Sequence, residues 1–130
     1  CKIVNNLIGM SVSVVLSEVF TLGAKAGVSP EILFEAVSKS SGNTQTMQAF
    51  PNGLFKGNFE AGFQLDLAAK DVGLATDMGR RLRIPMELCN LAQQRYIDAQ
   101  NRGWGKLASV AVARVQEERA GVELRAHSDE

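Results

Sequence analysis

A lysine and two asparagines stand together in the first six residues of the chain, CKIVNN. If this stretch is helical, Lys2 and Asn6 are four residues apart and share one face. Asparagine is a poor helix former because its side chain competes for backbone hydrogen bonds, so Asn5 and Asn6 in succession indicate that the amides serve a purpose. A lysine held by an amide in a polar pocket can give or take a proton. A solvated helix end is the other interpretation, and the spacing alone favours it.

A second group combines an aromatic ring, a cation and a carboxylate in the pattern Phe63-x-Leu65-x-Leu67-x-x-Lys70-Asp71. Lys70 and Asp71 fall in the first half of a predicted helix whose other face is apolar, and Phe63 precedes that helix, where its ring can form one wall of a cleft. Adjacent residues do not face each other on a helix, so a salt bridge between Lys70 and Asp71 explains little. Periodicity alone still favours ordinary exposed side chains.

Composition excludes several classes of protein. The chain has 130 residues, of which 45% are hydrophobic, and this suits one domain with one core. Its 14 basic and 14 acidic residues cancel, which argues against binding to nucleic acid or to an anionic membrane. Cys1, Cys89 and His127 are too few for a disulfide scaffold, a zinc site or a histidine-based triad, so we expect no metal.

The start of the chain is unusual. The most apolar stretch covers the first 25 residues, but glycine, serine and glutamate residues between positions 9 and 18 interrupt it, so we expect no membrane-spanning segment. Cys1 leads into a helical pattern with no cap before it. We therefore expect a fragment whose upstream residues are absent. Reduced cysteines suit the cytoplasm, or the mitochondrion if a transit peptide has been removed.

The spacing of apolar residues predicts helices along nearly the whole chain. Ser29 as N-cap, Pro30 at the first helical position and Glu31 in the first turn mark one helix start, and Gly27 is suited to end the helix before it. A connector rich in glycine and asparagine spans 52–62, and a polar tail spans 121–130. The predicted helices cover 2–25, 30 to the polar cluster at 38–43, 44–50, 64–82, 85 to about 103, and 106–120.

No strand is predicted, because the β-branched residues at 12–15 lie within a helical period. We therefore predict an all-α fold, a bundle of about six helices. On the helices over 64–82 and after 85, the side chains predicted to face inward include Ala68, Val72, Met78, Leu88, Leu91 and Tyr96.

These motifs, in this order, resemble those of the β-hydroxyacid dehydrogenase family, over about residues 2–109. The family includes 3-hydroxyisobutyrate dehydrogenase and tartronate semialdehyde reductase, with 6-phosphogluconate dehydrogenase as a more distant relative. The segments that carry the resemblance are Lys-x-x-Asn-Asn at the start of a long helix, Glu18, Gly27, the Ser40-Ser41-Gly42 loop, and Phe63-x-Leu65-x-Leu67-x-x-Lys70-Asp71-x-x-Leu74-Ala75.

The resemblance implies a two-domain NAD(P)-dependent oxidoreductase, of which residues 1–120 are the helical C-terminal domain with the architecture of the 6-phosphogluconate dehydrogenase C-terminal domain. A Rossmann domain would precede Cys1, and it would bind most of the NAD or NADP. Consistent with this, no G-x-G-x-x-G occurs in the sequence. The isolated chain is then expected to be inactive.

The resemblance also implies roles for individual residues. Lys2 would be the catalytic lysine, which donates a proton to the carbonyl oxygen as hydride arrives and accepts one in oxidation. Asn5 and Asn6 would hold the substrate, a small 3-hydroxy acid that resembles 3-hydroxyisobutyrate or glycerate, or its semialdehyde. A homo-oligomer is expected, with no nucleic-acid or membrane partner. Three further residues would bind the cofactor: Lys70 at the nicotinamide end of its site, and Phe63 and Asp71 at positions that line or brace the cleft between the domains.

One segment departs from the family pattern. Many members have acidic residues after a Gly-x-Gly near the last helix, whereas here residues 103–109 read GWGKLAS. The departure leaves the identity of the substrate open, but not the reaction class. The alternative to an enzyme is a non-catalytic helical module that associates with itself through an amphipathic face.

Overall fold

The computed structural model describes residues 1–127, and within them the fold is all-α, as predicted. The only β pairing among these residues is a single isolated bridge between Gln64 and Ala108. The α-helices are α1 (Lys2–Lys25), α2 (Pro30–Ser38), α3 (Leu65–Arg81), α4 (Glu87–Asn101) and α5 (Ala113–Ala120); the 3₁₀ turns are η1 (Thr46–Ala49), η2 (Leu54–Lys56) and η3 (Ser109–Val112).

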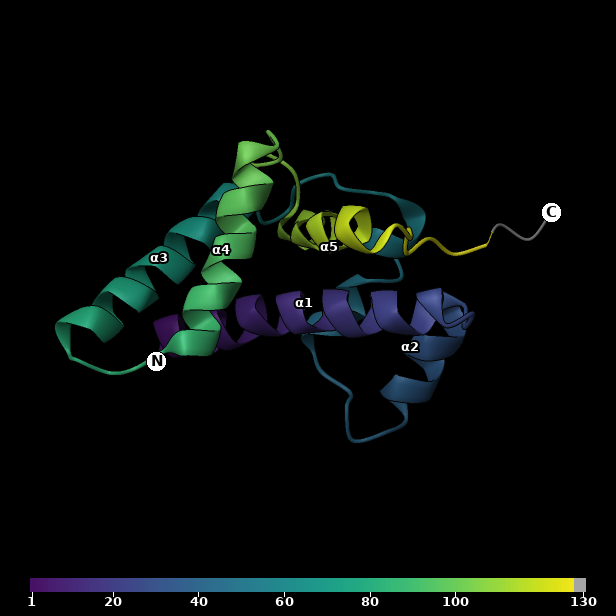
Figure 1. The fold of residues 1–130 in the computed structure, drawn as a ribbon, viewed down its shortest axis with the longest axis horizontal. Helices are drawn as coiled ribbons and strands as arrows, with labels where there is room; N and C mark the ends of the chain where they lie inside the picture. Colours follow the sequence, from purple (N-terminus) through teal and green to yellow (C-terminus); the bar gives the residue numbers. More distant parts are fainter. Residues whose placement is uncertain (128–130) are drawn as a thin grey trace.

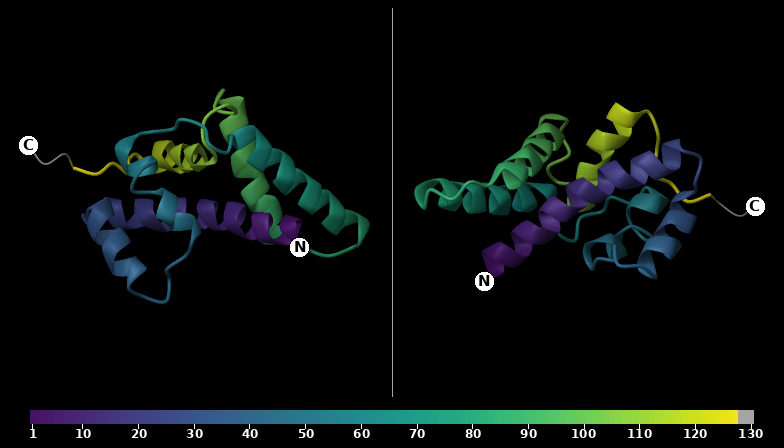
Figure 2. Two further views of the ribbon diagram at one scale, coloured as in Figure 1. Left: turned by 180° about the vertical axis from the view of Figure 1, so that it is seen from behind. Right: turned by 60° about the horizontal axis from the view of Figure 1, so that its bottom comes forward.

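Helix α1 forms the axis of the domain, and it contacts each of the other four α-helices. Helices α3 and α4 run antiparallel and lie against its N-terminal half, while α5 lies along its middle (Figure 1). Helix α2 packs at the C-terminal end of α1, and the views in Figure 2 show the connector after α2 passing on the side of α1 away from α4. The N-terminus of α1 is therefore the end that lies beside α3 and α4.

Local sequence explains where α1 and α2 meet. Gly27 adopts φ +103°, a left-handed conformation that favours glycine, and it ends α1. Ser29 then caps α2, where its Oγ accepts the amide of Ile32 at 3.4 Å, and Pro30 occupies the first helical position. The sharp corner between the two helices is therefore encoded within four residues.

Two apolar clusters make up the core. The first lies between α1, α3, α4 and η3 and includes Val14, Leu65, Val72 and Tyr96. The second lies beneath the connector, where Phe20 of α1 meets Phe50 edge to face with a centroid distance of 5.4 Å. The first cluster supports the end of the domain that carries Lys2.

The last predicted helix begins later than expected, at Ala113 rather than near residue 106. Residues 104–107 form a turn, closed by the bond from the Leu107 amide to the Trp104 carbonyl, and its backbone caps α3 instead. The carbonyls of Gly105 and Leu107 each accept an amide from the first turn of α3, Asp66 and Leu65 respectively, at 2.8 Å. These amides have no partner within their own helix, so the turn before η3 supplies the acceptors that the start of α3 needs.

Three side chains predicted to face inward are exposed. Met78 is 37% exposed, Leu88 80% and Leu91 65%, so the predicted orientation of these residues was wrong. Helix α4 also begins at Glu87, two residues after Pro85. Periodicity finds the apolar faces of a helix but does not distinguish a face turned to the core from one left at the surface.

Helix α1 is long and apolar enough to cross a membrane, contrary to the expectation from the sequence. It has 24 residues, and an 18-residue window reaches a mean hydropathy of 1.8. The serine and threonine residues interrupt it little, because the hydroxyls of Ser13, Ser17 and Thr21 donate to carbonyls of the preceding turn. The central helix of a globular domain meets the same criterion, and α1 takes that position here.

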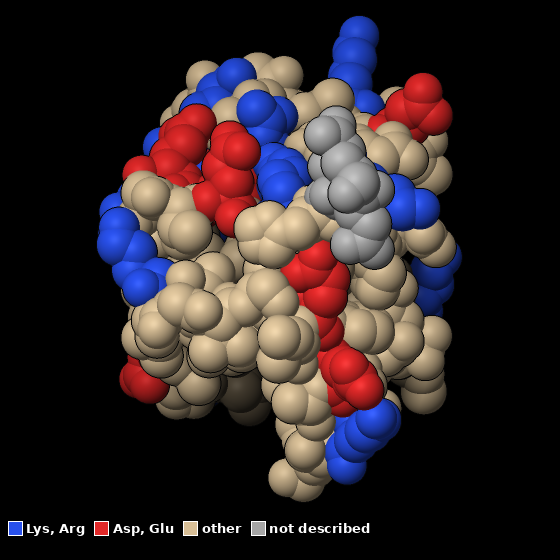
Figure 3. Space-filling view, turned by 90° about the vertical axis from the view of Figure 1, so that its right-hand side faces the viewer, with Lys and Arg blue, Asp and Glu red and all other residues tan. Residues whose placement is uncertain are grey.

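The residues after α5 pack against the domain. Leu124 is fully buried, and the carboxylate of Glu117 on α5 accepts the amide of Leu124 at 2.5 Å and a bond from Arg125 at 2.8 Å. Residues 128–130 of the predicted tail lie outside the described part of the chain. On the face drawn in Figure 3, basic and acidic side chains are interleaved, with no broad patch of one sign.

Candidate active site

An open groove lies beside the N-terminal half of α1. Its volume is about 430 Å³, and its walls come from α1, α4, η1, η3 and the segment before α3. Ten residues line it: Lys2, Asn5, Asn6, Gly9, Met10, Ser13, Thr46, Phe63, Tyr96 and Ser109. Four of the six residues singled out from the sequence are therefore brought together here.

The first two turns of α1 direct their polar side chains into this groove. Lys2 and Asn6, one helical turn apart, both line it, and Asn5 lies between them at the edge. Lys2 is exposed, whereas Asn6 is half-buried. The Lys2 amine is therefore accessible to a small molecule in the groove. Lys2 and Phe63 line the same groove, so they can belong to one site. A Lys2 side chain on the opposite side of α1 would have excluded a shared site.

Asp71 reaches the site indirectly. The Nδ2 of Asn6 donates a hydrogen bond to the Oδ2 of Asp71 at 3.3 Å, which links α1 to α3. Because an ionised carboxylate only accepts hydrogen bonds, the amide nitrogen must be the end of Asn6 that faces Asp71. Asp71 does not line the groove, and its contact with Asn6 is a positioning contact.

Phe63 and Lys70 lie on different sides of the start of α3. The ring of Phe63 is 43% exposed and lines the groove, and the Phe63 carbonyl accepts the amide of Ser109 at 2.8 Å. Lys70 is exposed on α3 and is absent from the groove walls. Phe63 thus shares a surface with Lys2, and Lys70 does not.

Four further small or hydroxyl-bearing residues of the groove were not predicted as site residues from the sequence. Gly9, Ser13, Thr46 and Ser109 come from α1, η1 and η3, and only their meeting in the fold identifies them. The one local signal was Gly9, because a glycine inside a long helix lowers helix stability and so indicates another requirement at that position.

Tyr96 forms part of the groove wall. Its side chain is 1% exposed, and its hydroxyl donates to the carbonyl of Met10 at 2.8 Å. Burial raises the pKa of Tyr96 well above its usual value of 10, and contact with the Ser13 hydroxyl opposes this effect in part. Tyr96 therefore stays protonated with its proton directed at the backbone, so it is not a second acid for the site.

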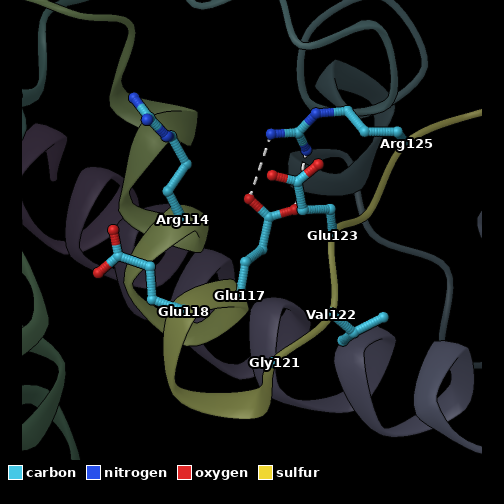
Figure 4. A pocket seen from close by; sticks show the side chains of 7 residues that line it. All are labelled: Arg114, Glu117, Glu118, Gly121, Val122, Glu123 and Arg125. Carbon is cyan, nitrogen blue, oxygen red and sulfur yellow. Dashed lines mark hydrogen bonds and ion pairs between the residues drawn. The ribbon is translucent and has the colours of Figure 1, made fainter.

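Another hollow, of about 300 Å³, lies beside α5 and is lined by charged residues (Figure 4). Two of its carboxylates are paired: Glu117 with Arg125 at 2.8 Å, and Glu118 with Arg102, which lies outside the hollow, at 2.7 Å. Figure 4 shows Arg114 and Glu118 projecting away from the Glu117–Arg125 pair. This arrangement holds the C-terminal segment in place and offers little to a substrate.

The residues present fit one end of a nicotinamide cofactor. Phe63 offers an exposed flat apolar ring beside Lys2, which is what a planar ring requires of its neighbours. The sequence holds no glycine-rich phosphate-binding turn, so the pyrophosphate would be bound elsewhere. Within residues 1–127, no three histidine, cysteine or acidic residues lie close enough together to hold a metal ion.

Comparison with known proteins places the chain among hydroxy-acid dehydrogenases. Residues 1–116 match the family described as NAD-binding of NADP-dependent 3-hydroxyisobutyrate dehydrogenase. A 2-(hydroxymethyl)glutarate dehydrogenase from Eubacterium barkeri is 36% identical over 124 residues, which cover 95% of this chain and 41% of that protein. The mitochondrial 3-hydroxyisobutyrate dehydrogenase of Mus musculus is 32% identical over 114 residues, or 81% of this chain and 33% of that protein.

Solved structures agree. The crystal structure of a 3-hydroxyisobutyrate dehydrogenase from Salmonella typhimurium superimposes with a TM-score of 0.82 at 26% identity, over 88% of this chain and 40% of that one. The chain thus spans between a third and two fifths of the length of the relatives described here.

Proposed function

Because the chain belongs to the family of NAD-binding domains of NADP-dependent 3-hydroxyisobutyrate dehydrogenase, we propose that it is the helical half of a nicotinamide-dependent dehydrogenase. The reaction interconverts a small 3-hydroxy acid and its semialdehyde. The nucleotide-binding half lies upstream of Cys1 and faces the groove. The observation that carries the proposal is the shared groove of Lys2, Asn6 and Phe63, which unites an ammonium, an amide and an exposed ring.

Lys2 has the chemistry that the substrate needs. The bound nicotinamide supplies hydride to the carbonyl carbon, and negative charge then develops on the carbonyl oxygen. An ammonium next to that oxygen stabilises the charge and donates the proton, so that the alcohol forms. In the oxidation direction the neutral amine of Lys2 accepts the hydroxyl proton. Its exposure at the groove mouth allows it to meet both substrate and cofactor.

The other residues orient the substrate and the cofactor. Asn6 is held by Asp71, and Asn5 lies beside it, so the two amides offer hydrogen bonds to a carboxylate or hydroxyl next to Lys2. Phe63 provides an apolar surface for the nicotinamide ring. Lys70, outside the groove on the exposed side of α3, contributes positive charge toward the cofactor phosphates or ribose.

The test uses the full-length enzyme. We expect Lys2→Met to lower kcat for reduction of the semialdehyde by about 10²–10⁴-fold, the range for loss of a positioned proton donor, while substrate binding changes little. Lys2→Arg should also be slow, because a guanidinium remains protonated and donates poorly. Lys39→Met serves as the control, because Lys39 is an exposed lysine that directly follows α2 and does not line the groove. A rate within a few-fold of wild type for Lys2→Met would refute the role.

An exposed apolar face of the domain supports a second function, association with another protein chain. On α1 the exposed side chains Val4, Ile8, Val15, Val19 and Leu22 lie on one side of the helix, between 49% and 71% exposed. Val4, Ile8 and Val15 also line an apolar groove of about 780 Å³ between α1 and α4, together with Leu88 and Leu91. Such a continuous exposed face marks an interaction surface.

We propose that this face binds a second copy of the chain. Because the exposed side chains and the groove form one surface, two copies related by a two-fold axis can bury this surface against each other. At the rim of the groove lie Glu18, Arg95 and Arg119, and the Glu18 carboxylate lies 3.5 Å from Arg95. The net charge of zero does not oppose such an association.

Sedimentation velocity tests the association. Leu91→Glu places a charge on the proposed interface and should convert the oligomer to monomer at micromolar concentration. Leu74→Glu is the matched control, because Leu74 is also an exposed leucine, at 49%, but it lies on α3 outside this face. A wild-type monomer, or an oligomer that Leu91→Glu leaves intact, would contradict the proposal and would assign the face to the upstream domain or to another contact.

A further inference from the structure

Three arginine side chains and two aromatic rings form a network beside α5. The guanidinium of Arg114 lies over the ring of Trp104, 4.1 Å from its centroid, and over the ring of Phe59, at 5.1 Å. Arg102 lies over the other side of the network at Trp104, at 5.7 Å, and Arg125 lies over Phe59 at 5.4 Å. Arg114 is the central guanidinium of the three, and cation–π contacts with both rings hold it in place.

The two outer guanidinium groups have carboxylate partners, whereas the central one does not. Arg102 donates to Glu118 at 2.7 Å, and Arg125 donates to Glu117 at 2.8 Å. Within residues 1–127, Arg114 makes no hydrogen bond and no ion pair. Attraction to a ring face fixes the position of a guanidinium but gives its N–H groups no oxygen to donate to. The network therefore holds one cation whose donors have no acceptor among these residues.

Arg114 lines an open hollow of about 430 Å³ between the connector before α3 and the start of α5. Lys106 adds a second cation to the wall of this hollow, and Phe59, Ala61 and Leu107 add apolar surface. A planar carboxylate matches the fork of N–H donors on a guanidinium, and a lysine ammonium acts as a point charge beside it. The hollow therefore suits an acid with a short apolar body.

The carboxylates near Arg114 limit the charge of such a ligand. Glu60 lines the same hollow, and Glu123 lines the neighbouring hollow that Arg114 also borders (Figure 4). Both glutamates are exposed, and in the described part of the chain neither forms an ion pair with Arg114. Because Coulomb repulsion grows with the charge of the ligand, these two groups oppose a dianion more than a monoanion. A monocarboxylate is therefore favoured over a phosphate.

The hollow is separate from the groove that holds Lys2, since no residue lines both. Phe59 lines the hollow and Phe63 lines the groove, and their carbonyls accept the amides of Ala108 and Ser109 at 3.0 and 2.8 Å. The two cavities thus lie at opposite ends of one pair of adjoining segments. An acid in the hollow would not meet Lys2.

We propose that Arg114 and Lys106 form a binding site for a small monocarboxylate outside the candidate active site. Arg114 binds the carboxylate through its N–H donors, and Lys106 supplies the second positive charge. Phe59 and Leu107 contact the apolar body of the acid. The proposal concerns binding alone, so it does not depend on the proposed dehydrogenase function.

The test is a ligand titration of the full-length enzyme followed at Trp104, the only tryptophan in these 130 residues. The protein is labelled with 5-fluorotryptophan, and the Trp104→Phe variant identifies the fluorine NMR signal of Trp104. Butyrate is the probe and butyramide is its neutral match, both at constant ionic strength. Butyrate should shift the Trp104 signal saturably in the millimolar range, and butyramide should not, because only butyrate carries a negative charge.

Variants assign the shift to the site. Arg114→Gln should weaken butyrate binding at least 5-fold, and Arg114→Lys, which keeps the charge but not the fork, should weaken it less. Lys106→Gln should weaken it about 2-fold without touching either ring. Arg119→Gln is the matched control, because Arg119 is an exposed arginine of α5 that lines neither hollow. The control and Lys2→Met should both bind butyrate as the wild type does.

Several results would overturn the proposal. Equal shifts with butyrate and butyramide, or no saturable shift up to about 50 mM butyrate, would show that no carboxylate site exists here. Undiminished affinity in Arg114→Gln would place the acid elsewhere, and loss of binding in Lys2→Met would place it in the groove. Inorganic phosphate at pH 7.5 should bind at least 5-fold more weakly than butyrate, and tighter binding of phosphate would contradict the choice of a monocarboxylate.

Discussion

The Nδ2 of Asn6 donates a hydrogen bond to the Oδ2 of Asp71 at 3.3 Å, although 65 residues separate them in the chain. The bond joins the first helix to the third beside the groove. Since the two ends of an amide point in opposite directions, holding Nδ2 on Asp71 also fixes where Oδ1 lies. The fold therefore presents Asn6 to a ligand with its carbonyl oxygen in a defined position.

Removal of this contact should lower activity more than stability. We expect Asp71→Ala to reduce kcat/KM of the full-length enzyme by about tenfold, the lower end of the effect of a hydrogen bond to a charged group. Asp71→Asn should recover most of the loss, because its side-chain oxygen can still accept from Asn6. Steady-state kinetics and urea denaturation of both variants make the comparison.

The two substitutions also separate position from charge. If the negative charge of Asp71 were the requirement, the asparagine and alanine variants would be equally slow. If both retained wild-type kinetics, the Asn6–Asp71 contact would have no part in the reaction. A loss of stability as large as the loss of activity would assign Asp71 to the fold rather than to the site.

Tyr96 should couple the stability of the domain to alkaline pH. It is the only tyrosine in the chain, so phenolate absorbance at 295 nm reports this residue alone. Burial raises its pKa above the usual value of 10. The contribution to stability is then complete below pH 10 and is lost as the pH rises further, because only the unfolded chain releases the proton easily.

We therefore expect the phenolate absorbance and the loss of helical circular dichroism to rise together above pH 10. Tyr96→Phe removes the bond to the Met10 carbonyl and should cost about 1 kcal/mol at neutral pH. The same variant should also lose less stability above pH 10 than the wild type. Tyrosine ionisation near pH 10 in a chain that remains fully helical would contradict the burial argument.

Local spacing in the sequence is enough to predict that Lys2 and Asn6 lie together. It does not predict which residues of other elements contact them. Lys2 and Asn6 share a face because they are four residues apart, and this holds for any helix. The partner of Asn6 is a different matter, since periodicity places Asp71 on its own helix without saying which helix packs against it. Thr46 and Ser109 enter the groove only because two short 3₁₀ turns approach α1.

The same limit explains the errors in α4. Leu88 and Leu91 belong to an apolar pattern and were predicted to face inward, yet they are 80% and 65% exposed. The pattern shows that these side chains favour an apolar environment, but it does not say whether the domain or a second protein supplies it. Tyr96 on the same helix was predicted correctly, because the core that it faces lies within the chain.

Glu31 should couple stability to acid pH. Hydrogen bonds from its own backbone amide and from the amide of His127, at 2.7 Å, lower the pKa of Glu31 below its usual value of 4.5. Its contribution is therefore complete above pH 4.5 and is lost as the pH falls through its folded pKa. The free energy of unfolding of wild type and Glu31→Gln should differ at pH 6, and the difference should shrink as the pH falls from 4.5 through the lowered pKa of folded Glu31. Curves that remain parallel down to pH 3 would show that Glu31 contributes no such coupling.

Glu117 should be the main attachment of the C-terminal segment. Its side chain is 5% exposed and accepts hydrogen bonds from Leu124 and Arg125, so Glu117→Ala leaves a buried guanidinium edge and a buried amide without a partner. Loss of one member of a buried pair typically costs about 3 kcal/mol. Glu118→Ala, which removes an exposed partner of Arg102, should cost well under 1 kcal/mol and is the control.

Urea denaturation measures the two costs, and hydrogen exchange at the Leu124 amide measures the local effect. In Glu117→Ala this amide should exchange at least 100-fold faster, a change that corresponds to about 2.7 kcal/mol of lost local protection. Glu117→Gln keeps an oxygen for the Leu124 amide but turns a donor group toward Arg125. The Leu124 amide of this variant should therefore exchange faster than in the wild type and more slowly than in Glu117→Ala. Equal protection in the Glu117→Ala and Glu118→Ala proteins would show that burial of Leu124, and not the carboxylate, holds the segment in place.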